Sequence, residues 1–138
     1  TPQAFENIKG AQALASREFF AGADIVFHAA GGAGRGVIME ASRLKKFAIG
    51  VDSNQNDIAP GRVLTSMVKR VDVAVYDIIS KFAAKQFTPG VLTYGLAEGA
   101  VGYAMDQHNQ DLIPYAVIQK VDEIRDQIIA KKIAMPSM

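Results

Sequence analysis

Three polar features of the sequence could together bind a small polar molecule: the glycine-rich turn Gly31–Gly36, Asp52 and Lys69. Each follows a short apolar run that has the composition of a buried strand. Glycine allows positive φ and lets a ligand approach the backbone, while the carboxylate accepts and the ammonium donates hydrogen bonds. If the three runs are neighbouring parallel strands, these groups meet at one edge of a sheet, which is the makeup of a polar ligand site.

Alternating apolar patterns predict the elements that would position this site. The helical spacing of apolar residues predicts helices over 8–20, 37–44, 70–87 and 114–133, and apolar runs predict strands over 25–30, 47–51, 63–68 and 91–96. The run 25–30 is nearly unbroken, which is typical of a strand covered on both faces. Alternating helices and strands predict an α/β fold with a doubly wound, mostly parallel sheet.

Each of these features also has a purely structural interpretation. The glycine turn Gly31–Gly36 lacks the G-x-G-x-x-G spacing of dinucleotide sites and could serve tight packing. Asp52 could cap the turn that follows it, and Lys69 could be a solvated residue at the start of a helix. His28 lies within an apolar run, where a histidine is more often a satisfied core residue than a ligand.

Composition excludes several classes of function. The 138 residues fit one domain of ordinary size, and 15 basic against 14 acidic residues give no field that would attract nucleic acid. The chain has no cysteine, its two histidines lack metal-ligand spacing, and no serine lies in a G-x-S-x-G elbow. No apolar run approaches the roughly 20 residues of a membrane span, and residues 1–5 lack the character of a signal peptide. We therefore expect no metal, no cofactor and no catalytic residue, and any targeting signal would lie outside this chain.

Three ordered motifs resemble one known family. The stretches FHAAGGAG (27–34), IGVDSNQ (49–55) and APGRVLTSMVKRVD (59–72) are similar to the basic membrane protein family of ABC-transporter substrate-binding lipoproteins, which includes purine nucleoside receptors. The similarity runs from residue 1 to about residue 133 but covers less than half of the length of family members. The part that this chain does not match would be the amino-terminal one.

The resemblance implies a particular architecture. Members resemble type I periplasmic binding proteins, in which two α/β lobes enclose a ligand in the cleft between them. This chain would supply the carboxyl-terminal lobe, with about 1–60 and 90–138 in the second lobe. The segment of about 63–87 would cross to the first lobe, which this chain lacks.

The resemblance also assigns roles to individual residues. Phe5 would stack on the nucleobase, Gly31 or Gly32 would offer backbone groups, Asp52 would accept hydrogen bonds from ribose hydroxyls, and Lys69 would bind the ligand or hold Asp52. The physical argument agrees for Asp52, because a buried carboxylate needs a cation or donors to offset its desolvation.

The function implied by the resemblance is binding of a nucleoside, expected to be a purine nucleoside, for an ABC importer, without enzymatic activity. Its partners would be the permease and ATPase subunits, and its location extracytoplasmic, either periplasmic or lipid-anchored to the outer face of the cell membrane. Two alternatives remain open at this point: a nucleotide-dependent α/β enzyme fragment, and a surface lipoprotein fragment that has lost transport. We also expect a chain without its first lobe to self-associate, because the helix over 70–87 would expose a stripe made of Val71, Val75, Ile78, Ile79 and Phe82.

Overall fold

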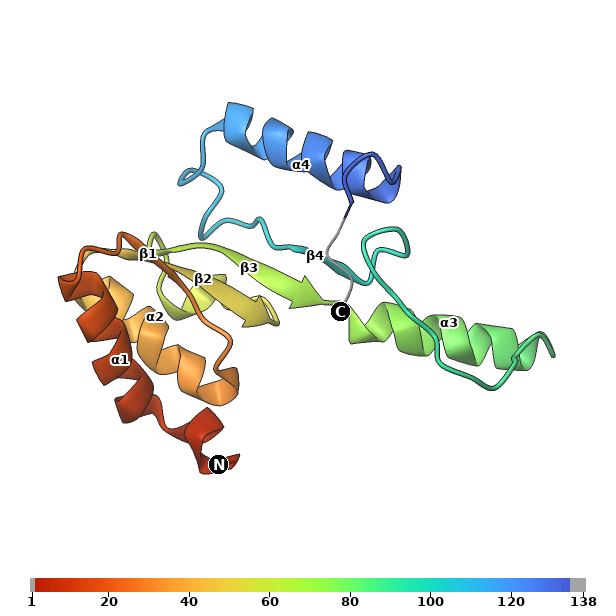
Figure 1. Cartoon of the computed structure of the whole chain (residues 1–138), viewed down its shortest axis with the longest axis horizontal. Coiled ribbons are helices and arrows are strands. Elements are labelled where there is room, and N and C mark those ends of the chain that lie inside the picture. The colour runs from red at the N-terminus through yellow and green to blue at the C-terminus, as the bar shows by residue number, and fades with distance from the viewer. Residues whose placement is uncertain (1, 135–138) are drawn as a thin grey trace. The chain divides into compact units, whose positions relative to one another are not determined.

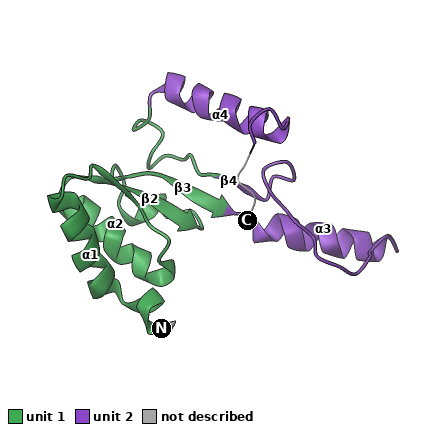
Figure 2. Cartoon of the chain, viewed as in Figure 1, with its two compact units in different colours: residues 1–68, 103–113 green, residues 69–102, 114–138 purple. Residues whose placement is uncertain are grey.

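The structure, a computed structural model, describes residues 2–134 of the chain. It divides into two compact units, which Figure 2 distinguishes by colour. The first unit contains residues 1–68 and 103–113, and the second contains residues 69–102 and 114–138.

Two helices of the first unit pack against each other, α1 (Ile8–Phe20) and α2 (Gly34–Arg43), as Figure 1 shows. The bounds of α1 are those that the sequence predicts. Asn7 caps this helix, because its Oδ1 accepts a hydrogen bond from the Gly10 N–H at 2.9 Å. Three short 3-10 helices, η1 (Pro2–Glu6), η2 (Gly31–Ala33) and η3 (Asn56–Ile58), complete the helical elements of this unit.

At Gly36 the backbone of α2 approaches the backbone of α1 closely. A side chain at this position would collide with the backbone of α1 at the carbonyl oxygen of Ile8, and backbone cannot move aside as a flexible side chain can. We expect Gly36→Ala to lower the free energy of unfolding by about 1–3 kcal/mol, the range for overpacking an interior. Urea denaturation measures this loss. Gly95→Ala is the matched control, since its Cβ would meet only the far end of Glu98, at 3.7 Å, and an equal loss there would contradict the packing argument.

The strands form one four-stranded sheet in the order β1-β2-β3-β4. Their bounds are β1 (Ile25–Phe27), β2 (Phe47–Asp52), β3 (Val63–Lys69) and β4 (Val101–Tyr103). β1 pairs with β2 and β2 with β3 in parallel. β4 runs the other way, since Ala104 donates to the Ser66 carbonyl and Arg70 to the Ala100 carbonyl. The predicted α/β class with a mostly parallel sheet is confirmed.

The core of the first unit lies between its helices and one face of the sheet. Its buried residues come from α1, η2, α2, β2, β3 and the loop before β3: Ala11, Ala15, Phe19, Ala33, Val37, Ile38, Ala41, Ala48, Ala59 and Val63. The expectation that the first strand is covered on both faces is wrong. Ile25 is 48% exposed and Phe27 57% exposed, because α1 and α2 cover the opposite face of the sheet.

The second unit contains α3 (Val71–Ala83) and α4 (Tyr115–Ile129), neither of which has a buried residue. The predicted stripe on α3 is exposed at four of its five positions, with exposed fractions of 48–72%, and only Ile78 is partly buried. α3 ends earlier than predicted, because Lys85 takes a left-handed conformation with φ of 57°. α4 likewise ends at Ile129, four residues before the predicted boundary.

The predicted strand over 91–96 is wrong, and the fourth strand lies at 101–103 instead. The segment 91–96 is irregular. Tyr94 donates a hydrogen bond to Asp77 on α3 at 2.6 Å, and Glu98 accepts one from the Gly95 N–H at 2.7 Å. Among the helices of residues 2–134, none combines the length and apolar character that crossing a membrane requires.

Candidate functional site

The first part of the candidate site is the turn that follows β1. Gly31 opens η2 with φ of 53°, a left-handed conformation that favours glycine. A Cβ added to Gly31 would lie 3.4 Å from Cδ1 of Phe5, and one added to Gly32 would lie 3.4 Å from the Phe5 carbonyl oxygen. The structure therefore brings Phe5, Gly31 and Gly32 together. Phe5 remains 57% exposed, so its ring is available to a further contact.

The second part is Asp52, the last residue of β2, whose backbone is strained. Its φ is 68°, and the Ser53 N–H donates to the Val51 carbonyl at 2.8 Å, which closes a γ-turn around Asp52. A left-handed conformation at a residue other than glycine costs about 1–3 kcal/mol and is found preferentially at functional positions. Asp52 is exposed in this chain, so the expectation of a buried carboxylate is wrong for the chain by itself.

The third part of the candidate site is Lys69, which is the last residue of β3 and is exposed. It follows Val68, which is the register partner of Asp52 in the parallel pairing of β2 and β3. Lys69 belongs to the second unit, whereas Asp52 belongs to the first. An interaction between Lys69 and Asp52 therefore stays a prediction.

His28, immediately after β1, is a core histidine with one bonded nitrogen. Only 5% of the residue is exposed, and its Nε2 lies 3.1 Å from Oε1 of Gln55. Its Nδ1 is buried and has no hydrogen-bond partner among the residues that the structure describes. Burial lowers the pKa of His28 from its ordinary value, against the opposing effects of the Gln55 hydrogen bond and the charge of Asp52. The histidine is therefore buried, as expected, but only partly satisfied.

Sequence reasoning missed a polar network beneath these residues, built from amide and hydroxyl side chains. Gln55 donates its backbone N–H to Ser66 Oγ at 3.0 Å, and Ser66 Oγ donates to Asn56 Oδ1 at 2.8 Å. Asn56 in turn donates to Asp106 at 3.1 Å, as does Asn54 at 2.7 Å. These hydrogen bonds, that of Asn54 first, lower the pKa of Asp106. The three consecutive amide residues 54–56, which follow the end of a strand, could have indicated this network in the sequence.

The buried His28 predicts a pH dependence of stability. Because its pKa is lower in the folded chain than its ordinary value of 6.5, the unfolded chain binds the proton more readily. The free energy of unfolding should be unaffected by this group above pH 6.5 and should fall as the pH drops from there through the folded-state pKa of His28. His28→Gln should remove that part of the dependence, and chemical denaturation between pH 7.5 and about 5 measures it. An unchanged slope in the variant would contradict the assignment.

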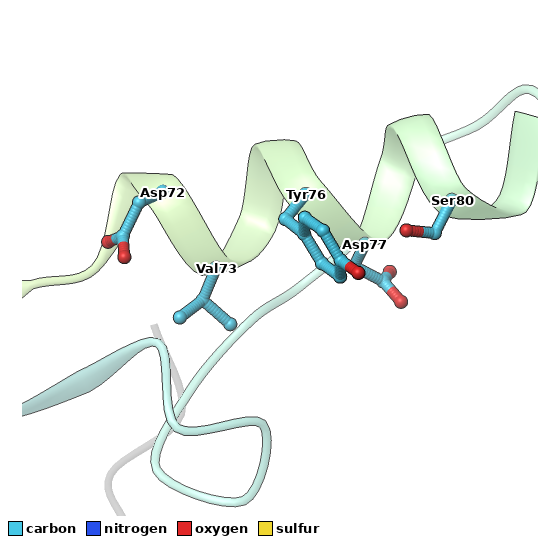
Figure 3. A pocket seen from close by; sticks show the side chains of 5 residues that line it. All are labelled: Asp72, Val73, Tyr76, Asp77 and Ser80. Atoms are coloured by element: carbon cyan, nitrogen blue, oxygen red, sulfur yellow. The ribbon is translucent and has the colours of Figure 1, made fainter.

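A surface hollow on α3 provides a second place to consider for binding (Figure 3). It is lined by Asp72, Val73, Tyr76, Asp77 and Ser80, all from one helix. Its carboxylates already have partners: Asp72 bonds Arg70 at 2.7 Å, and Asp77 bonds Lys81 at 2.6 Å as well as Tyr94. None of the residues predicted for the ligand site lines this hollow. Within residues 2–134, no group of acidic or histidine residues is arranged to hold a metal ion.

Comparison with known proteins places this geometry in a family context. Residues 3–138 match the family described as "ABC transporter substrate-binding protein PnrA-like". The chain is 40% identical over 144 residues to the CD4+ T-cell-stimulating antigen of Listeria monocytogenes, with 91% of this chain and 39% of the relative covered. It is 32% identical over 136 residues to basic membrane protein A of Borreliella afzelii, with 96% of this chain and 41% of the relative covered.

Solved structures agree at the level of the fold. The structure of a transcriptional activator of the comK gene from Bacillus halodurans matches with a TM-score of 0.85 at 21% identity, covering 96% of this chain and 46% of the other. A solute-binding protein of an ABC transporter system from Aeropyrum pernix matches with a TM-score of 0.79 at 22% identity, covering 97% of this chain and 46% of the other. This chain thus spans about two fifths of the length of those curated relatives. It belongs to the PnrA-like family of ABC-transporter substrate-binding proteins.

Proposed function

We propose that this chain is the carboxyl-terminal part of a substrate-binding protein that delivers a nucleoside, specifically a purine nucleoside, to an ABC importer. The observation that carries the proposal is the strained Asp52, which ends β2 within one of the motifs of a substrate-binding family. The exposed ring of Phe5 against the glycine turn supports it, since an aromatic face accepts a base by stacking.

Each proposed ligand contact has a distinct chemical task. Phe5 stacks on the nucleobase, and Gly31 or Gly32 offers backbone groups in the turn where no Cβ blocks approach. Asp52 accepts hydrogen bonds from the two ribose hydroxyls, which neighbouring carboxylate oxygens suit well. Lys69 donates to the ligand or holds the Asp52 carboxylate in place.

The proposed architecture has two lobes with the ligand between them. Residues of about 1–60 and 90–138 form the second lobe, and the segment of about 63–87 crosses to a first lobe that precedes this chain in family members. The permease and ATPase subunits of the importer are the partners, and the protein acts outside the cytoplasm, periplasmic or lipid-anchored to the outer face of the membrane.

A ligand comparison tests the proposed function. The part of the Listeria monocytogenes relative that this chain does not match, fused in front of this chain, gives a two-lobed protein, called the completed protein below. Inosine and adenosine should bind it and raise its melting temperature, whereas inosine monophosphate should not, because the proposed contacts include no phosphate site. Preference for the nucleotide would overturn the proposal and favour a nucleotide-dependent enzyme.

The isolated chain should self-associate. The α3 stripe of Val71, Val75, Ile78, Ile79 and Phe82 is largely exposed, and contiguous apolar surface of this kind rarely stays bare in water. We expect a dimer by light scattering at micromolar concentration, and a shift toward monomer in the variant Ile79→Lys. Asp77 carries an ion pair on the same helix, so Asp77→Asn serves as the control that should leave the dimer intact. A monomer of 14.8 kDa that binds inosine tightly by itself would contradict this prediction.

A further inference from the structure

We infer that Gln55 and His28 are positioning residues for Asp52: Gln55 locks the strained turn that presents the Asp52 carboxylate, and His28 locks Gln55. The ligand-binding consequence of this inference rests on the proposed function. The structural part does not, because it concerns hydrogen bonds among described residues alone.

Gln55 contacts the backbone beside Asp52. The Val51 N–H donates to Oε1 of Gln55 at 3.0 Å, and the carbonyl of the same Val51 accepts from the Ser53 N–H. Both polar backbone groups of the residue before Asp52 are thereby occupied. Since Gln55 is itself fixed through its own N–H on Ser66 Oγ, the γ-turn around Asp52 is tied to β3 through Gln55.

The hydrogen bonds of Gln55 determine the orientation of its side-chain amide and the tautomer of His28. A backbone N–H can only donate, so the Gln55 atom facing Val51 must be the oxygen. The same oxygen lies 3.1 Å from Nε2 of His28, and that nitrogen must therefore carry a hydrogen. Neutral His28 is thus the Nε2–H tautomer, with a buried, unprotonated Nδ1.

Gln55 and His28 each pack closely against a glycine. A Cβ added at Gly50 would lie 2.9 Å from Oε1 of Gln55, and one added at Gly34 would collide with the ring of His28. Two glycines therefore make room for this pair, one in β2 and one at the start of α2. Two close approaches that only glycine permits indicate that the position of both side chains is fixed by packing as well as by hydrogen bonds.

The test compares two substitutions of Gln55. Gln55→Met keeps the length of the side chain but removes the acceptor, whereas Gln55→Glu keeps an acceptor for both Val51 and His28. In the chain itself, NMR should show a strong amide-to-Hα Overhauser effect within Asp52, the mark of positive φ, in the wild type and in Gln55→Glu. Gln55→Met should lose this signal, and its Val51 amide should exchange at least about tenfold faster with solvent.

In the completed protein, Gln55→Met should weaken inosine binding about tenfold while Gln55→Glu stays near the wild type. A Gln55→Met chain that keeps the Asp52 signal would overturn the inference. One that loses the signal with unchanged inosine affinity would overturn its ligand-binding consequence, and both outcomes leave the proposed function standing. A wild type that binds no inosine, combined with loss of the Asp52 signal in Gln55→Met, would reject the proposed function and support the positioning role. The tautomer of His28 in the wild type decides the matter even if Gln55→Met does not fold, because an Nδ1–H tautomer contradicts the inferred bond.

Discussion

Asp52→Ala should abolish useful nucleoside binding by the completed protein, with a loss of about 2–5 kcal/mol in binding free energy. This is the scale for removing one charged member of a hydrogen-bonded contact, which the closed two-lobed cleft is proposed to desolvate. The substitution removes the two oxygens that are proposed to accept from the ribose hydroxyls, and with them the carboxylate that is proposed to hold Lys69. Isothermal titration of inosine measures the loss.

Asp57→Ala, in the loop that follows Asp52, is the control for Asp52→Ala. Asp57 is also an exposed aspartate, in η3, and Asp57→Ala should leave inosine affinity unchanged. Alanine is disfavoured at positive φ, so Asp52→Ala could also disturb the backbone at this position. Asp52→Asn is the second variant, because asparagine tolerates positive φ. Asp52→Asn should still bind weakly, and an affinity of Asp52→Ala within about threefold of the wild type would remove Asp52 from the ligand contacts.

Phe5→Ala should weaken purine nucleosides by about 1–3 kcal/mol and leave free ribose unaffected, because stacking involves only the base. The ring rests against Gly31 on one side and is largely exposed, so its removal should cost little folding stability. Competition titrations with inosine and with ribose separate the two effects. Phe20→Ala, which removes a ring that is 77% exposed at the end of α1, is the control. Equal losses for both ligands would mean that Phe5 supports the fold and does not recognise the base.

The elements of the first unit were predictable because their signals are local. The apolar spacing in 8–20 predicts α1 to the residue, and the apolar runs before Asp52 and Lys69 predict β2 and β3 to within one residue. The strand predicted over 91–96 failed for a different reason. Its apolar residues suit a strand, but Tyr94 is held by Asp77, which lies 17 residues earlier, and no local pattern reveals such a contact.

The candidate site likewise has some features that local sequence patterns reveal and others that depend on distant residues. Strand ends and glycines are visible in a sequence, so Gly31, Gly32 and Asp52 could be named from it. The Gln55–His28 bond joins residues 27 positions apart, and the positive φ of Asp52 arises from the surrounding turn. The exposed face of β1 could not be predicted either, because a continuous apolar run has the same sequence pattern whether one or both faces of the strand are covered.

The central claim is that this chain carries half of a nucleoside site, and calorimetry on the completed protein and on the chain alone tests it most directly. We expect inosine to bind the completed protein with a single site, to bind the isolated chain too weakly to measure, and to lose its affinity for the completed protein in Asp52→Ala. A half site leaves the ligand exposed to water. Hydrogen bonds between the chain and the ligand then replace hydrogen bonds to water, and the net gain in binding free energy is small. Equal inosine affinity in the completed protein and the isolated chain, or undiminished affinity in Asp52→Ala, would contradict the account.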